Sequence, residues 1–185
     1  SGVGDPLDIK TTKLMMILKL LSLGIGASGV KWSTIKQLEK MINANVIPLI
    51  PHQGSVGASG DLAPLAHMTS VMIGEGWALY KGQKIKGIDA LSRAGINPIE
   101  LGPKEGLALI NGTQFSTACA LSSLFDSWNL LLNSIVISSI TTDAIMGSTS
   151  PLLEKIHELR GQKGQIFVAK KMRELIQGSM IRESH

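Results

Sequence analysis

A long run of apolar residues at helical spacing occupies the second half of the chain. The run extends from about Glu105 to about Met146, and Pro151 follows it. Its apolar side chains recur at intervals of three and four residues, which is the spacing of one face of a helix. These side chains are Leu121, Leu124, Phe125, Trp128, Leu132 and Ile135. The pattern predicts one long core helix and favours an all-α fold.

Further helices are predicted over residues 13–23, 34–45, 62–73 and 164–179. The first is apolar nearly all round, which indicates a helix buried on most sides or one that needs partners. Thr34 and Gln37 have the spacing of a capping box. Asp61 is a candidate N-cap of the third helix, and Pro64 lies in its first turn, where a missing amide proton costs little. Residues 78–88, with Gly82 and Gly87, predict a small surface hairpin.

Composition limits the classes of protein to which the chain can belong. Its 185 residues are 44% hydrophobic, enough for one substantial core and a single domain. A net charge of +4 with only 4% aromatic residues argues against a nucleic-acid surface. The single cysteine, Cys119, rules out a disulfide within the chain and suits a reducing, cytoplasmic location.

No membrane association is expected from the sequence. The first residues lack the pattern of a signal peptide. The longest apolar runs are interrupted by Lys19, Asp126 and Asp143, and none reaches the roughly 20 residues that span a bilayer.

The glycine-rich stretch "GSVGASGDLAPLAHM", residues 54–68, lies directly before a predicted helix. A phosphate-binding P-loop would need Lys and Ser or Thr after its last glycine, whereas Asp61 and Leu62 follow Gly60. The glycine spacing also differs from that of dinucleotide-binding loops. Because Asp61 replaces the final glycine of a G-x-S-x-G elbow and parallel strands are lacking, Ser59 is not expected to be a triad nucleophile.

The tripeptide Ala58, Ser59, Gly60 can instead supply a reagent from its own backbone. The unhindered Gly60 nitrogen can attack the Ala58 carbonyl carbon in a tight bend, and loss of water then closes a five-membered ring. Loss of a second water from Ser59 leaves an exocyclic methylidene, which is a strong electrophile. The N-terminus of the next helix would stabilise negative charge that develops on it. By themselves these three residues are far more typical of a flexible turn.

The whole stretch resembles the signature of the aromatic amino acid ammonia-lyases, which build a methylidene-imidazolone from Ala-Ser-Gly. A second segment, "KEGLALINGTQFSTA" at residues 104–118, is similar to the Asn-containing motif of that family. "NGTQ" and "LAPLAHM" are more similar to the histidine ammonia-lyases than to the phenylalanine ammonia-lyases. The resemblance covers residues 1–185, but residues 160–165, "RGQKGQ", depart from the Arg-Pro-His-Pro-Gly-Gln that is usual in the family.

The resemblance implies that residues 1–185 are the single central region of a longer lyase chain, with a long-helix bundle and a small hairpin. Ala58, Ser59 and Gly60 would form the prosthetic group, with no external cofactor and no metal. Asp61 would support the group by capping and hydrogen bonds, with Gln114 in a lesser role. Asn111 would hydrogen-bond near the prosthetic group and the substrate, although it is equally suited to cap the long helix.

The implied reaction is non-oxidative elimination of ammonia from L-histidine to give urocanate in a cytoplasmic homotetramer of histidine catabolism. In the family a tyrosine on a loop preceding the matched region is the base, so Tyr80 is not assigned that role, and the isolated chain is expected to be inactive. His52 and His67 are expected to make local hydrogen bonds. Two alternatives stay open: a phenylalanine or tyrosine ammonia-lyase or aminomutase with the same prosthetic group, and a noncatalytic helical association module.

Overall fold

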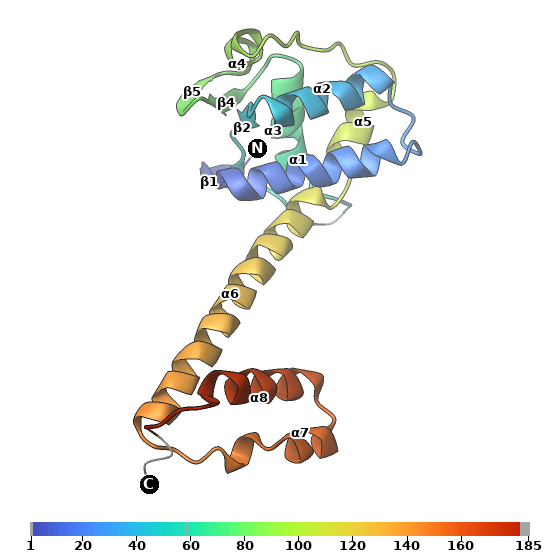
Figure 1. Cartoon of the computed structure of the whole chain (residues 1–185). Coiled ribbons are helices and arrows are strands. Elements are labelled where there is room, and N and C mark those ends of the chain that lie inside the picture. Colours follow the sequence, from blue (N-terminus) through green and yellow to red (C-terminus); the bar gives the residue numbers. More distant parts are fainter. Residues whose placement is uncertain (1, 58, 182–185) are drawn as a thin grey trace. The chain divides into compact units, whose positions relative to one another are not determined.

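The computed structural model describes residues 2–57 and 59–181, and these divide into two compact units, Ser1–Ser123 and Leu124–His185. Both units are dominated by helices (Figure 1). The all-α prediction with a small hairpin is therefore confirmed. The hairpin consists of β4 (Trp77–Tyr80) and β5 (Gln83–Lys86), which pair antiparallel.

The helical framework of the first unit consists of α1 (Ile9–Gly24), α2 (Trp32–Asn43), α3 (Leu62–Met72), α4 (Gly87–Arg93) and α5 (Glu105–Ile110). Helix α1 packs against α2, and α3 packs against α5 (Figure 1). The core between these elements is rich in methionine and leucine, flexible and compact side chains that fill irregular gaps. Its fully buried members include Met15, Met16, Leu38, Met41, Leu65, Met68, Met72 and Leu109.

Short strands that the sequence did not reveal frame this core. Strand β1 (Val3–Pro6) pairs antiparallel with β3 (Pro51–Gln53), and β2 (Ile47–Pro48) pairs antiparallel with β4. The first pair anchors the chain just before the glycine-rich stretch. His52 Nδ1 lies 2.8 Å from the carbonyl oxygen of Asp5 across it, which confirms the expected local hydrogen bond.

The structure contradicts two predictions about α2, its first residue and its capping box. Helix α2 begins at Trp32, and Thr34 and Gln37 do not form a capping box, because tertiary partners take both side chains. The Thr34 hydroxyl donates to Glu105 Oε1 at 2.6 Å, and Gln37 Nε2 donates to the Asn97 carbonyl at 2.9 Å. Because α2 begins at Trp32, Thr34 is the third residue of the helix and does not occupy the N-cap position that a capping box requires.

The long apolar region forms two helices instead of one. Helix α5 ends at Ile110, and α6 (Gln114–Ala144) begins after an extended residue, Asn111, and Gly112 with a φ of +142°. Residues 114–123 of α6 belong to the first unit and residues 124–144 to the second. The second unit also contains a 3-10 turn (Ser150–Leu152), α7 (Glu154–Arg160) and α8 (Lys163–Ile176).

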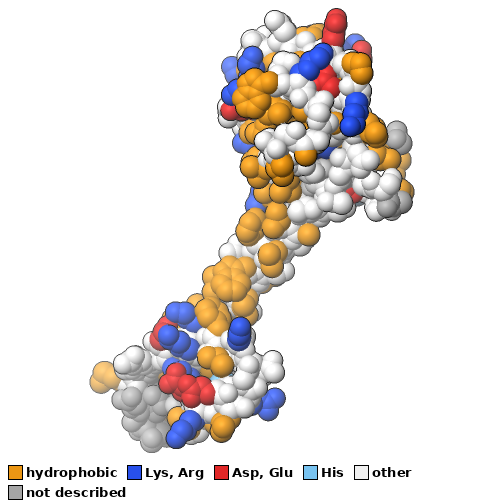
Figure 2. Space-filling model, turned by 90° about the vertical axis from the view of Figure 1, so that its right-hand side faces the viewer, with side chains coloured by type: hydrophobic (Ala, Val, Ile, Leu, Met, Phe, Trp, Pro, Cys, Tyr) orange, Lys and Arg blue, Asp and Glu red, His pale blue; other side chains and the backbone are white. Residues whose placement is uncertain are grey.

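Helix α6 is not the buried core helix that its spacing predicted. Apolar side chains follow its length (Figure 2), and many of them are exposed, including Leu124, Trp128, Leu130, Ile137 and Ile140. The helical stretch Glu105–Ala144 is long and apolar enough to cross a membrane by length and composition alone. Asp126 and Asp143 lie within this stretch, as the sequence predicted, but they do not lower its mean hydropathy below that of a candidate span.

Candidate active site

The glycine-rich stretch ends where α3 begins, and Gly60 is its most constrained described residue. Ala58 lies outside the described residues. Ser59 is exposed, whereas Gly60 is buried with a φ of +128°, a conformation that side chains rarely allow. A Cβ atom on Gly60 would lie 2.8 Å from the Gly112 nitrogen and 3.0 Å from Asn111 Oδ1. Only glycine fits between this loop and the Asn111–Gly112 segment.

The two sequence segments that carry the family resemblance therefore meet in space. The Asp61 amide donates to the Gly112 carbonyl oxygen at 2.7 Å, which fixes the second motif against the first. Gly112 is also restricted to glycine, because its φ of +142° is a conformation that side chains rarely adopt. The sequence predicted both motifs but could not show that they touch.

Asp61 is an almost completely buried carboxylate at the junction where the glycine-rich stretch meets the Asn111–Gly112 segment. Its Oδ1 accepts the Ser55 hydroxyl at 2.5 Å and the Ser116 hydroxyl at 2.7 Å, and its Oδ2 accepts the Ser116 amide at 2.8 Å. Burial by itself raises the pKa of this carboxyl, but the hydrogen bonds from Ser116 and Ser55 outweigh burial, and the pKa lies below its ordinary value. Asp61 therefore remains ionised at neutral pH.

The prediction that the Asp61 side chain caps α3 is wrong, although Asp61 does occupy the N-cap position. The Ser116 amide belongs to the first turn of α6, where backbone N–H groups have no acceptor within the helix. The carboxylate satisfies this amide and places negative charge at the positive end of α6. The predicted local hydrogen bonds of Asp61 are present, but they connect the loop to α6.

Asn111 and Gln114 are the two predicted site residues that come from the second motif, on either side of Gly112. Asn111 is exposed and ends α5, so it does not cap the long helix. Gln114 Oε1 is buried and lacks a hydrogen-bond partner among the described residues. An unsatisfied buried acceptor beside the Gly112 backbone is unusual in a protein interior and is consistent with a further polar group at this site.

Lys19 is the residue of this region that the sequence analysis missed. It is 1% exposed in the middle of α1, and its Nζ donates to the Asn111 carbonyl oxygen at 2.8 Å. Burial lowers the pKa of Lys19 to about 8. The available signal was its spacing of four residues from both Met15 and Leu23, which places a lysine on the apolar core face of its helix.

Other candidate groups lie apart from this junction. The Tyr80 hydroxyl donates to the Arg93 carbonyl at 3.4 Å beside the hairpin, which agrees with leaving it out of the catalytic set. Cys119 is half-buried, and burial raises the pKa of its thiol. Within residues 2–57 and 59–181, no group of three or more His, Cys, Asp or Glu side chains is arranged to hold a metal ion.

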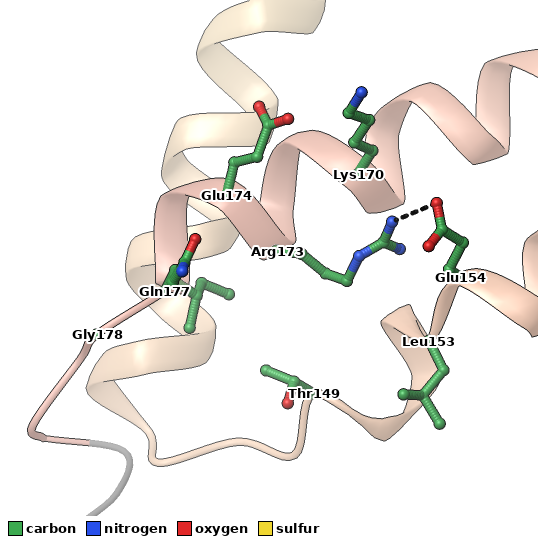
Figure 3. A pocket seen from close by; sticks show the side chains of 9 residues that line it. Thr149, Leu153, Glu154, Lys170, Arg173, Glu174, Gln177 and Gly178 are labelled. Atoms are coloured by element: carbon green, nitrogen blue, oxygen red, sulfur yellow. Dashed lines mark ion pairs between the residues drawn. The ribbon is translucent and has the colours of Figure 1, made fainter.

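A separate cavity of about 510 Å³ lies within the second unit, between α8 and the segment that leads into α7 (Figure 3). Arg173 and Glu154 point toward each other at its edge, with Arg173 Nη2 3.6 Å from Glu154 Oε1. The Arg173 guanidinium also donates to the Leu152 carbonyl at 2.5 Å. These contacts hold α8 against the preceding turn, and the lining contains no residue of either motif.

Comparison with known proteins agrees with the resemblance of the two motifs. The family model for aromatic amino acid lyases matches residues 1–185. A curated histidine ammonia-lyase of Roseobacter denitrificans is 61% identical over 184 residues, which cover all of this chain and 36% of that protein. The chain therefore spans about a third of the length of this relative.

Solved structures agree on the fold. The chain is similar to histidine ammonia-lyase from Trypanosoma cruzi, with a TM-score of 0.88 and 35% identity over 94% of this chain and 34% of that one. It is also similar to phenylalanine aminomutase from Pantoea agglomerans, with a TM-score of 0.92 and 32% identity over 98% of this chain and 35% of that one. By family model, sequence and fold, this chain belongs to the aromatic amino acid lyase family.

Proposed function

We propose that the protein containing this chain is a histidine ammonia-lyase that eliminates ammonia from L-histidine to give urocanate. The observation that carries the proposal is the close packing of Gly60, with its φ of +128°, against Gly112 and Asn111, since it brings the two motifs of the family together at one site. The 61% identity to a curated histidine ammonia-lyase supports histidine over phenylalanine or tyrosine as the substrate.

The residues at the junction fit a methylidene-imidazolone formed from Ala58, Ser59 and Gly60. Ring closure joins the Gly60 nitrogen to the Ala58 carbonyl carbon and releases water, and Ser59 then loses its hydroxyl and α-hydrogen as a second water. Gly60 can approach because it lacks a side chain, and Ser59 is exposed where a substrate would arrive. The group supplies an electrophile toward the substrate amine, which makes a poor leaving group a better one.

The remaining residues of the junction position and polarise this site. The Asp61 carboxylate fixes the start of α3 against α6, and the first amides of α3 stabilise negative charge near the loop. The Asn111 side chain lies beside Gly60 and would hydrogen-bond near the group and the substrate. The base that removes the β-hydrogen would come from a part of the protein outside residues 1–185.

We further propose that the protein is a cytoplasmic homo-oligomer in which α6 packs against other subunits. Its exposed apolar side chains, such as Leu130 at 68% and Ile137 at 63%, support a subunit interface. A bundle of long helices accounts for the length and apolar composition of this helix without a membrane. The single cysteine is consistent with a reducing compartment.

The deciding experiment measures the intact mass of the purified full-length protein and its product from L-histidine. We expect a deficit of two water molecules in the peptide that contains residues 58–60, together with urocanate formation. Ser59→Ala should prevent the second loss of water and abolish most turnover, because it removes the hydroxyl that leaves.

Each alternative gives a different result. An unmodified wild-type mass would refute the proposed chemistry and favour a noncatalytic helical module. A two-water deficit with turnover of phenylalanine or tyrosine, but not of histidine, would favour another lyase or an aminomutase.

A further inference from the structure

Lys19 is a buried cation whose position is costly for folding. It is 1% exposed on the core face of α1, with Met15, Met16 and Leu23 buried around the same face. Among the described residues, no carboxylate oxygen lies within 4.0 Å of its Nζ, and its hydrogen bond is to the Asn111 carbonyl. An ammonium with one neutral acceptor recovers only part of its desolvation cost. A methionine would fill the same space without that cost.

The group that Lys19 holds is the peptide that faces the signature loop. Asn111 leaves α5 in an extended conformation, with φ −94° and ψ 130°, so its carbonyl oxygen lies outside the helical pattern and is free to accept from α1. The nitrogen of the same peptide, that of Gly112, would lie 2.8 Å from a Cβ atom on Gly60. Lys19 therefore contacts one end of a peptide whose other end abuts Gly60.

The following carbonyl, that of Gly112, is held from the opposite side by the Asp61 amide at 2.7 Å. Two successive carbonyls of this segment are thus fixed, one by α1 and one by the start of α3. A hydrogen bond from a charged donor is stronger than one from a neutral donor, and it polarises the amide that it contacts. The hydrogen bond from Lys19 therefore restricts the Asn111–Gly112 segment. A shift of this segment would loosen its packing against Gly60.

We propose that Lys19 is a positioning residue for formation of the prosthetic group: by holding the Asn111 carbonyl, its ammonium keeps the Asn111–Gly112 peptide against Gly60, so that the Gly60 nitrogen is positioned for ring closure. This inference rests on the proposed function. It assigns to a buried lysine of α1 a role in the maturation of the site, without any contact to the substrate.

The test compares three variants of the full-length protein: Lys19→Met, Lys19→Arg and Lys13→Met. Lys13 lies on the same helix, and its Nζ donates to Asn45 Oδ1 near the surface, so Lys13→Met is a matched control for loss of a lysine. Samples are purified at set times after the start of expression. Intact mass gives the fraction that has lost two waters, and thermal unfolding reports stability.

We expect Lys19→Met to fold with a melting temperature equal to or above that of the wild type, because it removes a buried charge. Its ring should form about ten- to a hundredfold more slowly, the size of effect that a misplacement of about 1 Å produces. Lys19→Arg keeps the charge and should cyclise faster than Lys19→Met, and Lys13→Met should match the wild type. A purely structural lysine would change the melting temperature and not the rate of water loss in the folded protein.

The inference is overturned if folded Lys19→Met cyclises at the wild-type rate, or if Lys19→Arg cyclises no faster than Lys19→Met. If Lys19→Met does not fold, Lys19→Gln replaces it, with slow cyclisation expected and a wild-type rate contradicting the inference. A wild-type protein that never loses two waters refutes the proposed function itself. Failure of the function and failure of the inference are therefore distinct outcomes.

Discussion

Removal of the Asp61 carboxylate should release the first turn of α6 from the signature loop. In Asp61→Ala the Ser116 amide loses its acceptor, and the hydroxyls of Ser55 and Ser116 lose theirs. Hydrogen bonds to a charged group contribute about 1.5–3 kcal/mol each, and part of this is recovered when the exposed ends rehydrate. We expect a local cost of roughly 3–5 kcal/mol for opening this junction.

Asp61→Asn should be milder, because the amide can adapt to the same partners. Its oxygen can accept the Ser116 amide while its NH₂ group donates to the hydroxyls of Ser55 and Ser116, since a hydroxyl can reverse its role. Only the charge assistance is lost, and we expect a cost of about 1–3 kcal/mol. The predicted order of stability at the junction is wild type, then Asp61→Asn, then Asp61→Ala.

Native-state hydrogen exchange of peptides that cover residues 111–120 measures this local opening directly. Since 1.4 kcal/mol corresponds to a factor of ten, the Ser116 amide should exchange about a hundred- to a few-thousandfold faster in Asp61→Ala. Asp89→Ala, on the exposed face of α4, is the control and should leave this peptide unchanged. Equal protection of the Ser116 amide in the wild type and in Asp61→Ala would refute the reasoning.

Three other perturbations test separate parts of the structure. Gly60→Ala should cost about 2–5 kcal/mol through left-handed strain and the contact with Gly112, and a melting temperature equal to that of the wild type would contradict this. Hydrogen bonds from Thr34 above all, outweighing burial, lower the pKa of Glu105, so its stabilisation is complete above the ordinary value of 4.5 and is lost as the pH falls below it. Glu105→Gln should therefore lower the melting temperature at pH 7 and converge with the wild type on acidification, whereas a pH-independent difference would count against this role. Ile137→Glu, on the exposed face of α6, should dissociate the oligomer in light scattering after gel filtration, and an unchanged mass would remove α6 from the interface.

The helices and the two motifs were predictable from the sequence because they depend on neighbours along the chain. Apolar spacing predicted α1, α2, α3 and α8 to within a few residues, and the glycines of 78–88 predicted the hairpin. The chemistry proposed for residues 58–60 is likewise local, since ring closure would join atoms only two residues apart. The break between α5 and α6 was missed because apolar segments lie on both sides of Asn111–Gln114, and the backbone angles of Asn111 and Gly112 depend on distant partners.

The tertiary structure alone decided which polar groups meet. The Asp61 side chain was expected to cap its own helix, but its carboxylate accepts a hydrogen bond from the amide of Ser116, 55 residues away. Lys19 donates to a carbonyl 92 residues away, and Thr34 donates to a carboxylate 71 residues away. A buried polar group must find a partner, and the choice depends on which segments packing brings together. The sequence by itself therefore determined the helices and the two motifs, whereas only the packed chain determined which residues hold Gly60 in place.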